Sequence, residues 1–447
     1  MYCNKFLNRV LSLALVATLL TACGGGGGGE STPVPSTPVP STPVPSTPVP
    51  STPVVPSTPV VPSTPVVPST PVVPTVPEAT NVSELTVDAG PSGTGYNVNR
   101  LYTTVKVCNP GTTQCQTIDH VLVDTGSFGV RLLSSAMDAT LNLNRSTGAS
   151  GFPLLNCAQF IDNSFAWGPV VKADVVLGGK TAASVPIQVI ADPSFNSLAA
   201  TCSSGTAMTT AKTLGANGIL GIGLLKEDCG TRCSNTVNNG SYYTCTTARC
   251  IATTGAKTSL AQQVKNPVPL FASDNNGVLI DLPTANSPGA PNLSGSLIFG
   301  IGTQSNNQWT SGAVLTTDSV GYVTTSLAGQ NLTNSFIDTG SNGLFFDSTT
   351  ITKCGPSADG FYCPTTPTTL SATLVGANGA ASPEILFSID KATDLFTGGV
   401  NHVLPTLAGT GSPNSFDWGL SFFYGRRVFF GIEGQASTLG TGPFYAF

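Results

Sequence analysis

The sequence predicts an all-β protein built from two related halves, and two observations carry that prediction. Short apolar runs rich in Val, Ile, Thr and Phe, broken by Gly, Pro, Asn and Ser, fill the chain after residue 80 and have the patterning of strands and hairpins. An eight-residue motif occurs twice, as VDTGSFGV at residues 123–130 and as IDTGSNGL at residues 337–344. Helical periodicity is scarce, so we expect only a few short helices, with residues 260–264 as the best position.

The N-terminus reads as an export signal. Lys5 and Arg9 flank the start of an apolar run at residues 10–20, which is too short to span a membrane. Residues 20–23 read LTAC and resemble the bacterial lipobox, in which Cys23 is lipidated and becomes the new N-terminus. The alternative is an ordinary cleavable signal with an incidental cysteine. We predict a lipoprotein signal peptide at residues 1–23 and an exported bacterial lipoprotein of the cell envelope, tethered through Cys23 on the periplasmic side of the outer membrane or at the cell surface.

Residues 24–80 are expected to be a linker. A glycine run at residues 24–29 is followed by four copies of STPVP at residues 31–50 and four copies of STPVVP at residues 51–74. Proline at this density blocks helix and sheet ladders and favours extended polyproline II. We interpret the tract as a spacer; the alternative is a Pro-rich binding segment.

The remaining residues, 81–447, exceed one typical hydrophobic core, so we expect two lobes at residues 81–310 and 311–447. Charged residues are only 9% of the chain and the net charge is −5. No basic run indicates nucleic-acid binding, and no later apolar run indicates a membrane span. We expect a monomer.

Cysteine usage agrees with export. Cys3 leaves with the signal and Cys23 takes the lipid, so ten of the 12 cysteines remain. An even number in an exported chain indicates disulfides. We expect the pairs 108–115, 354–363 and 157–202, while residues 229, 233, 245 and 250 allow three pairings. A metal site at residues 229–250 is the alternative, although the spacing is poor for zinc.

Seven segments have the clearest strand character, because β-branched and apolar residues dominate them and turn residues bound them. They are residues 100–107, 121–123, 170–177, 185–191, 278–282, 296–300 and 427–432.

The repeated motif predicts the site. One copy alone is weak evidence, because Asp and Gly are common in turns. Two copies indicate that each half offers one carboxylate, Asp124 or Asp338, to a shared site. Two carboxylates that share a proton can activate a water molecule.

At this point the chain resembles the pepsin-like aspartic peptidases over about residues 95–447, and more closely an uncharacterised family of bacterial lipoproteins related to pepsins. Landmarks occur in the family's order at residues 124–127, 217–223, 269–271, 295–300, 338–341 and 418–430. The resemblance implies a bilobal pepsin-like acid-protease fold with pseudo-two-fold related lobes, and a membrane-tethered aspartic endopeptidase. The alternative is a non-catalytic pepsin-like lipoprotein that binds peptide or glycan in the cleft between the lobes.

The residues around each Asp fit these roles. Gly126 and Gly340 let the two turns approach each other, Ser127 and Ser341 can each hydrogen-bond their own Asp, and Thr125 and Thr339 can brace the turns. Two carboxylates about 3 Å apart cannot both ionise, so the pair holds one proton. The ionised member takes a proton from water and the protonated member donates to the scissile carbonyl. The substrate would be a polypeptide, with no cofactor and no metal.

The chain departs from the pepsin pattern near the first Asp. The family usually has a Trp where this chain reads Gly129-Val130-Arg131-Leu132, and a flap Tyr where residues 160–168 have none. We hypothesise that Trp167 or Phe165 covers the site, with Arg131 stacked on the indole. The alternative is that Trp167 is a plain core residue.

Two further expectations concern charged groups. His120 and His402 give little support to a Ser-His-Asp triad, and the context of the two Asp residues gives none to a glycosidase pair. Between Arg9 and Arg100 there is no Lys or Arg, so we expect no basic prosegment that blocks the Asp pair and no need for processing.

Overall fold

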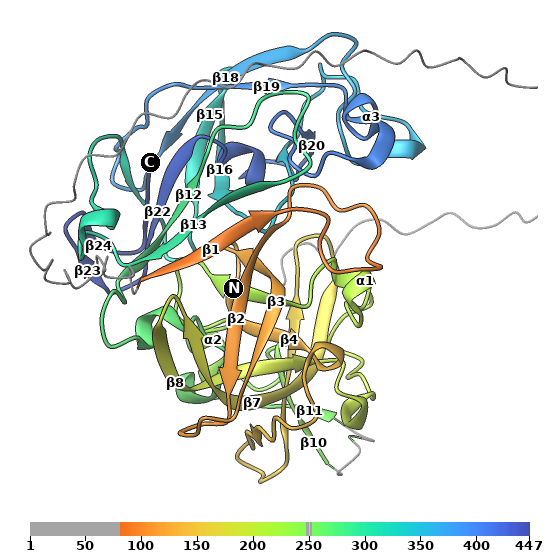
Figure 1. The fold of residues 1–447 in the computed structure, drawn as a ribbon, viewed down its shortest axis with the longest axis vertical. Coiled ribbons are helices and arrows are strands. Elements are labelled where there is room, and N and C mark those ends of the chain that lie inside the picture. Colours follow the sequence, from red (N-terminus) through yellow and green to blue (C-terminus); the bar gives the residue numbers. More distant parts are fainter. Residues whose placement is uncertain (1–80, 247–249, 251–252) are drawn as a thin grey trace, which may run out of the picture. The chain divides into compact units, whose positions relative to one another are not determined.

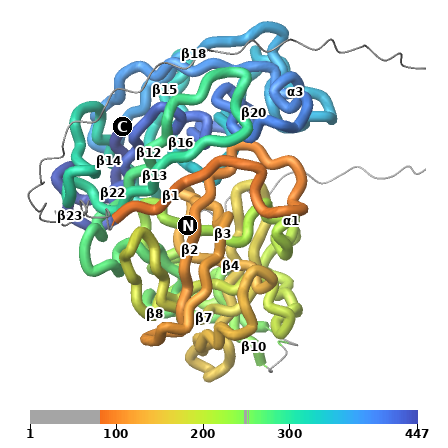
Figure 2. The backbone as a smooth tube through the Cα atoms, viewed as in Figure 1, coloured from red at the N-terminus to blue at the C-terminus, as the bar shows by residue number. Residues whose placement is uncertain are grey.

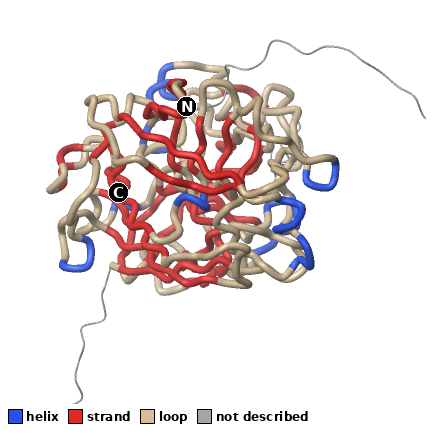
Figure 3. The backbone as a smooth tube through the Cα atoms, turned by 90° about the horizontal axis from the view of Figure 1, so that it is seen from above, coloured by secondary structure: helices blue, strands red, loops and turns tan. Residues whose placement is uncertain are grey.

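The computed structural model describes residues 81–246, 250 and 253–447. The predicted signal peptide, the predicted lipidation site Cys23 and the predicted linker lie outside them. The described chain is all-β with few short helices, and Figure 3 shows strands throughout and helices only as brief turns. None of the helices in the described ranges has the length and apolar character that a membrane crossing requires.

Six strands close into a barrel. Their order is β7-β8-β4-β9-β3-β2, and β2 pairs back onto β7 with Val107 opposite Val175. Side chains from all sides of this ring, including Val123, Ile187 and Leu220, belong to the main hydrophobic core. The strands are β2 (Leu101–Cys108), β3 (Cys115–Asp124), β4 (Phe128–Leu133), β7 (Phe165–Leu177), β8 (Lys180–Ile190) and β9 (Gly218–Ile222).

The same sheet continues beyond the barrel on both sides. On one side β6, β10 and β11 extend it from β7, and on the other β1 leads from β2 through β13, β12 and β22 to β25 and β14. Strands that precede and follow residue 310 therefore belong to one sheet. The strand pairing of that sheet is continuous across the boundary predicted between residues 310 and 311. Figure 2 shows β1, β13 and β12 side by side. The bounds are β1 (Val82–Val87), β5 (Asn144–Arg145), β6 (Leu154–Gln159), β10 (Tyr242–Cys245), β11 (Thr253–Gly255), β12 (Gly277–Leu282), β13 (Leu293–Phe299), β14 (Val314–Thr316), β22 (Arg426–Gly431) and β25 (Phe444–Ala446).

A second sheet lies above the barrel in the view of Figure 1, with the order β19-β18-β15-β16-β21-β17-β20. In β15 buried and half-buried residues alternate, as expected for a strand with one face on the core. Its strands are β15 (Val323–Leu327), β16 (Gln330–Ile337), β17 (Leu344–Phe346), β18 (Thr368–Val375), β19 (Ile385–Ile389), β20 (Ala408–Thr410) and β21 (Phe416–Trp418), and a separate hairpin joins β23 (Ala436–Ser437) to β24 (Gly440–Thr441).

All seven predicted strand segments are strands, most of them longer than predicted at the N-terminal end. The predicted helix at residues 260–264 is only a three-residue 3₁₀ turn, Leu260–Gln262. Its sequence was too short to nucleate a helix without a cap, and no side-chain cap is present. The α-helices in the described ranges are α1 (Ala211–Leu214), α2 (Thr231–Asn235) and α3 (Ala392–Leu395).

Five disulfides lie in the described part of the chain. The three predicted pairs are present, and the other four cysteines pair locally as Cys229–Cys233 and Cys245–Cys250. The four cysteines of residues 229–250 are thus bonded to one another in two pairs, which leaves no free thiolate there for the alternative metal site.

Asn99 fastens the start of the barrel to the chain around the second motif. Its side chain is fully buried and donates to the carbonyl oxygens of Asn342 and Leu404, each at 2.8 Å. Its oxygen accepts from the Leu404 N–H and from the Tyr424 hydroxyl, both at 2.7 Å. A positive φ of 49° suits Asn better than most residues. Residues more than 240 positions apart in sequence are therefore held together beside Ser341.

Candidate active site

The first Asp loop is built by three strands. β3 ends at Asp124, the chain turns through residues 125–127, and β4 returns. β9 lies between them, parallel to β3 with Asp124 opposite Gly221, and antiparallel to β4 with Gly129 opposite Gly221. A Cβ at Gly221 would lie 2.6 Å from the Phe128 backbone nitrogen, so the close approach requires glycine.

The second Asp loop has the same construction. β16 ends at Ile337, Asp338 opens the turn, and β17 returns. β21 lies between them, parallel to β16 with Ile337 opposite Trp418, and antiparallel to β17 with Leu344 opposite Trp418. The two loops therefore share strand order and direction, as the repeated motif predicts for this part of the chain.

Two threonines lock the loops together by reciprocal hydrogen bonds. The Thr125 N–H donates to Thr339 Oγ1 at 3.1 Å, and the Thr339 N–H donates to Thr125 Oγ1 at 2.9 Å. The Thr339 hydroxyl in turn donates to the Val123 carbonyl oxygen at 2.7 Å. Both side chains are buried, so these bonds have no competition from water.

The turns bring the two carboxylates to one amide. The Gly126 N–H lies 2.9 Å from Asp124 Oδ1 and 2.9 Å from Asp338 Oδ1, so it donates to both inner oxygens. A Cβ on Gly126 would lie 2.6 Å from Asp338 Cγ, and one on Gly340 would lie 2.6 Å from Asp124 Oδ1. Each loop therefore requires glycine where it faces the other loop's acid.

The outer oxygens are held by the two serines. The Ser127 hydroxyl donates to Asp124 Oδ2 at 2.5 Å, while Ser341 Oγ lies 3.0 Å from Asp338 Oδ2. The serine of the first loop therefore lies closer to its own Asp than the serine of the second loop does.

Burial raises the pKa of Asp338 well above its usual range, and the neighbouring carboxylates of Asp124 and Asp417 add to the shift. The hydrogen bond from the Gly340 N–H acts in the opposite direction. Asp338 is 8% exposed, but Gly126 beside it is exposed, so water can reach the pair. The arrangement can hold one proton and one negative charge beside a water molecule.

A third acid, Asp417, lies behind the second loop. Its Oδ2 is 2.6 Å from Ser341 Oγ, and burial raises its pKa to about 8. The sequence analysis missed Asp417 because it is the residue just before the landmark that begins at Trp418. The signal was available in the sequence: aligning Gly221 with Gly419 matches residues 218–221 with residues 416–419 and sets Asp417 against Ile219.

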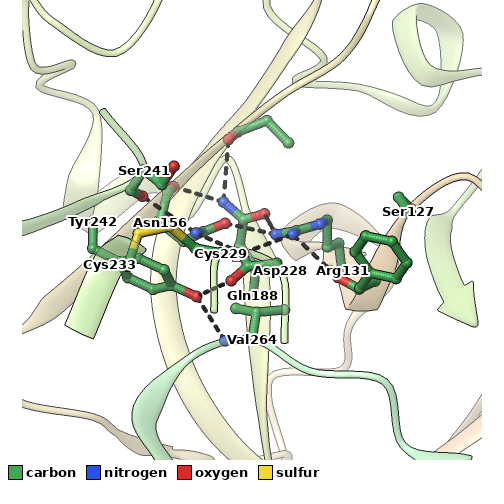
Figure 4. Close-up of polar contacts among 12 residues, drawn as sticks. Ser127, Arg131, Asn156, Gln188, Asp228, Cys229, Cys233, Ser241, Tyr242 and Val264 are labelled. Atoms are coloured by element: carbon green, nitrogen blue, oxygen red, sulfur yellow. Dashed lines mark hydrogen bonds and ion pairs between the residues drawn. A yellow bond between two sulfur atoms is a disulfide. The ribbon is translucent and has the colours of Figure 1, made fainter. Parts of the chain in front are cut away.

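Arg131 does not stack on Trp167, and that prediction is wrong. Its guanidinium is 3% exposed and pairs with Asp228 at 3.0 Å. It also donates to Asn156 Oδ1 at 2.6 Å and to Gln188 Oε1 at 2.8 Å (Figure 4). The Tyr242 hydroxyl donates to the other oxygen of Asp228 at 2.6 Å and accepts from the Val264 N–H.

A buried guanidinium needs a counter-charge and hydrogen-bond acceptors, and this network supplies both. An aromatic face would have supplied neither in full. Because Arg131 lies on β4, the network ties the strand that returns from Asp124 to β6, β8 and the Cys229–Cys233 segment.

Trp167 and Phe165 lie in a buried cluster with Phe195, Tyr243 and the Cys157–Cys202 disulfide. The Trp167 indole N–H donates to the Phe195 carbonyl oxygen at 2.9 Å, and the ring packs edge-on against Tyr243. Phe165 is 5% exposed. These contacts give Trp167 the role of a core residue, which was the alternative to the covering role. The exposed part of the hairpin is its tip, where Ile161 is 63% exposed.

Neither histidine forms a triad. His120 contacts Asp119 and Asp88, and His402 Nδ1 lies 2.6 Å from the Asn97 carbonyl oxygen. Within the described ranges no cluster of three or more His, Cys, Asp or Glu has the geometry of a metal site.

Comparison with known proteins places this geometry in a family. Residues 77–447 match the model of a family described as a protein of unknown function (DUF3443). No curated protein matches the chain significantly. The match spans both Asp loops, Asp417 and the Arg131 network.

Removal of Asp228 should strongly destabilise the fold. In Asp228→Ala the Arg131 guanidinium stays buried without its counter-charge, so we expect a loss of about 3–5 kcal/mol in the free energy of unfolding. The matched control is Asp281→Ala, since Asp281 pairs with Arg427 where both are more than a third exposed. That variant should lose about 1 kcal/mol or less. Equal losses in urea unfolding would contradict this account of Arg131.

The Trp167→Ala variant should also lose stability, because its side chain fills the cluster with Phe195 and Tyr243. We expect a cost of about 3–5 kcal/mol. In Ile161→Ala, on the exposed tip of the same hairpin, the change should stay within about 0.5 kcal/mol. Thermal or urea unfolding measures both, and a stable Trp167→Ala protein would show that the indole is not a core residue.

The stability of the wild-type protein should fall as the pH rises from 5 to 8. Asp338 and Asp417 have raised pKa values in the folded state, about 8 for Asp417 against 3.8 for the ordinary group. The folded protein then binds protons that the unfolded chain has released, so this stabilisation is complete below pH 4 and is lost through pH 8. Each such proton lowers the free energy of unfolding by about 1.4 kcal/mol for every pH unit between the two pKa values.

Urea midpoints at constant ionic strength measure this dependence. Asp359→Asn, at an exposed turn, is the control and should keep the wild-type slope. A midpoint that stays constant or rises between pH 5 and pH 8 would mean that the two buried acids are ionised in the folded protein.

Proposed function

The chain belongs to the DUF3443 family, and we propose that it is an aspartic endopeptidase whose Asp124 and Asp338 activate a water molecule against a peptide bond. The observation that carries the proposal is the single Gly126 N–H, which lies 2.9 Å from an inner oxygen of each carboxylate. Two acids from loops of the same construction are thus held where they must share a proton. The resemblance to the pepsin-like peptidases supports the same reaction.

The roles of the two acids follow from their contacts. Asp124, which accepts the short hydrogen bond from Ser127, is the base that takes a proton from water. Asp338 holds the shared proton, since burial and the adjacent acids raise its pKa, and donates it to the scissile carbonyl oxygen. Water attacks the carbonyl carbon, a tetrahedral diol forms, and the amine leaves after it gains a proton.

The cellular setting forms part of the proposal. The lipobox at Cys23, the Pro-rich tract and the five disulfides together favour an exported enzyme that is tethered to a membrane surface and works in an oxidising compartment. Its substrate would be a polypeptide with an exposed or unfolded segment.

The test is cleavage of a denatured protein mixture by the purified protein from pH 3 to pH 8. Asp124→Asn and Asp338→Asn should each lose at least about a thousandfold in kcat/KM, because either change removes one of two groups that act as a unit. Pepstatin, which carries a hydroxyl on a tetrahedral carbon and so mimics the diol, should inhibit the wild type.

Asp347→Asn is the matched control, since Asp347 is 51% exposed and pairs with Lys353 at the surface. It should keep wild-type activity. The wild type could instead be folded and disulfide-bonded, show no activity at any pH, and still bind peptide or glycan. That result would refute the peptidase and support the non-catalytic binding protein.

A further inference from the structure

Asp417 is a buried acid that the proposed mechanism does not use. It is 7% exposed, and its Oδ1 has no hydrogen-bond partner. None of the ion pairs formed by the described residues includes it. A carboxylate ion with one buried, unbonded oxygen and no counter-charge is strongly disfavoured, so the position favours the neutral acid.

The hydrogen bonds of Ser341 give the same result by counting protons. Ser341 Oγ lies 3.0 Å from Asp338 Oδ2 and 2.6 Å from Asp417 Oδ2. A hydroxyl carries one proton, and ionised carboxylates only accept, so Ser341 can donate fully to one of the two acids. The other contact needs a proton on the acid. The proton of the dyad serves the contact between Asp124 and Asp338, so the proton needed at Ser341 is a further one, and Asp417, whose Oδ1 receives no hydrogen bond, is its better holder.

The surroundings of Asp417 contain acids and apolar groups. Its strand neighbours in register are Phe336 on β16 and Phe345 on β17. Across Ser341 lie Asp338 and Asp124, and from β25 the Tyr445 hydroxyl approaches, donating to the Gly321 carbonyl oxygen at 3.0 Å. Burial raises the pKa of Asp417 to about 8; the Ser341 hydrogen bond opposes that shift, and the charge of Asp124 adds to it.

The repeat shows that an acid is not needed at this position for folding. In the first loop Leu220 lies opposite Val123, and the residue before Leu220 is Ile219, which is 2% exposed. In the second loop Trp418 lies opposite Ile337, and the residue before Trp418 is Asp417. In the first loop an apolar side chain fills this position. The carboxyl at the same position of the second loop is therefore not explained by folding alone.

We propose that Asp417 is a positioning acid of the second loop, and that the working site holds two protons, one shared by Asp124 and Asp338 and one on Asp417. Asp417 donates to Ser341, and Ser341 therefore donates to Asp338. This inference rests on the proposed peptidase function and adds to it a cause for the upper pH limit of activity. When Asp417 loses its proton, Ser341 turns its own proton towards Asp417 and Asp338 loses that hydrogen bond.

The change Asp417→Asn tests the proton count through the pH profile of kcat/KM. A site with two protons can lose either one as the pH rises, whereas the asparagine variant can lose only the proton of the dyad. The upper limb should therefore move to higher pH, by about 0.3 pH units if the two protons are equally acidic and by more if Asp417 is the more acidic. Asp359→Asn, at its exposed turn, should leave the limb in place.

The direction of the shift decides between the alternatives. If Asp417 is ionised in the working enzyme, its removal takes away a negative charge that raises the pKa of Asp338, and the limb moves to lower pH. If Asp417 only fills space, the limb does not move. Either result overturns the inference.

A second measurement does not depend on enzymatic activity. Carbon-13 resonances of labelled Asp carboxyls in the full-length wild type should show two groups still protonated at pH 6, one in the dyad and one at Asp417. The Asp417→Asn protein, where it folds, assigns the second resonance. One protonated carboxyl in an active enzyme would refute the role of Asp417. Two protonated carboxyls in an inactive protein would support the proton on Asp417 and would refute the proposed peptidase function.

Discussion

The structure depends on holding two acids together that would repel each other as ions. One N–H, that of Gly126, lies between them, and no side chain fits at Gly126 or Gly340 without overlapping the opposite carboxylate. The reciprocal bonds of Thr125 and Thr339 fix the distance between the loops. Two carboxylates held this close relieve their repulsion by sharing a proton, and a shared proton is what the proposed mechanism requires.

The two loops share a construction but differ in environment, and the difference assigns their roles. Behind Asp124, the return strand is anchored by the Arg131–Asp228 network, which supplies a full charge balance of its own. Behind Asp338, Ser341 faces a second carboxyl instead. The serine of the first loop thus contacts one carboxyl, whereas the serine of the second loop contacts two. A repeat gives two equal acids, and the residues around each copy make them unequal.

The sequence predicted what is local and missed what is long-range. Seven strands followed from their own apolar runs, and the two Asp turns followed from a repeated motif that is contiguous in the chain. The return pairing of β2 onto β7, and the pairing of β1 with β13 across some 200 residues, leave no mark in either segment alone. Arg131 was assigned to an aromatic partner because its true acceptors, Asn156, Gln188 and Asp228, are scattered in sequence. Asp417 was missed because it stands just before the landmark that begins at Trp418, and only comparison of the two central strands marks it as unusual.

Buried acids link the chemistry of such a site to the stability of the protein around it. Each proton that the folded state retains above the ordinary pKa of an acid is lost on unfolding, so alkaline conditions weaken the fold and the site together. Elsewhere the chain resists this by means that do not depend on pH: five disulfides, the threonine bonds and the Asn99 contacts beside Ser341. An acid such as Asp417 can persist in the core only because these restraints keep the loop in place when its proton leaves. Because Ile219 fills the corresponding position of the first loop, packing alone does not require an acid there.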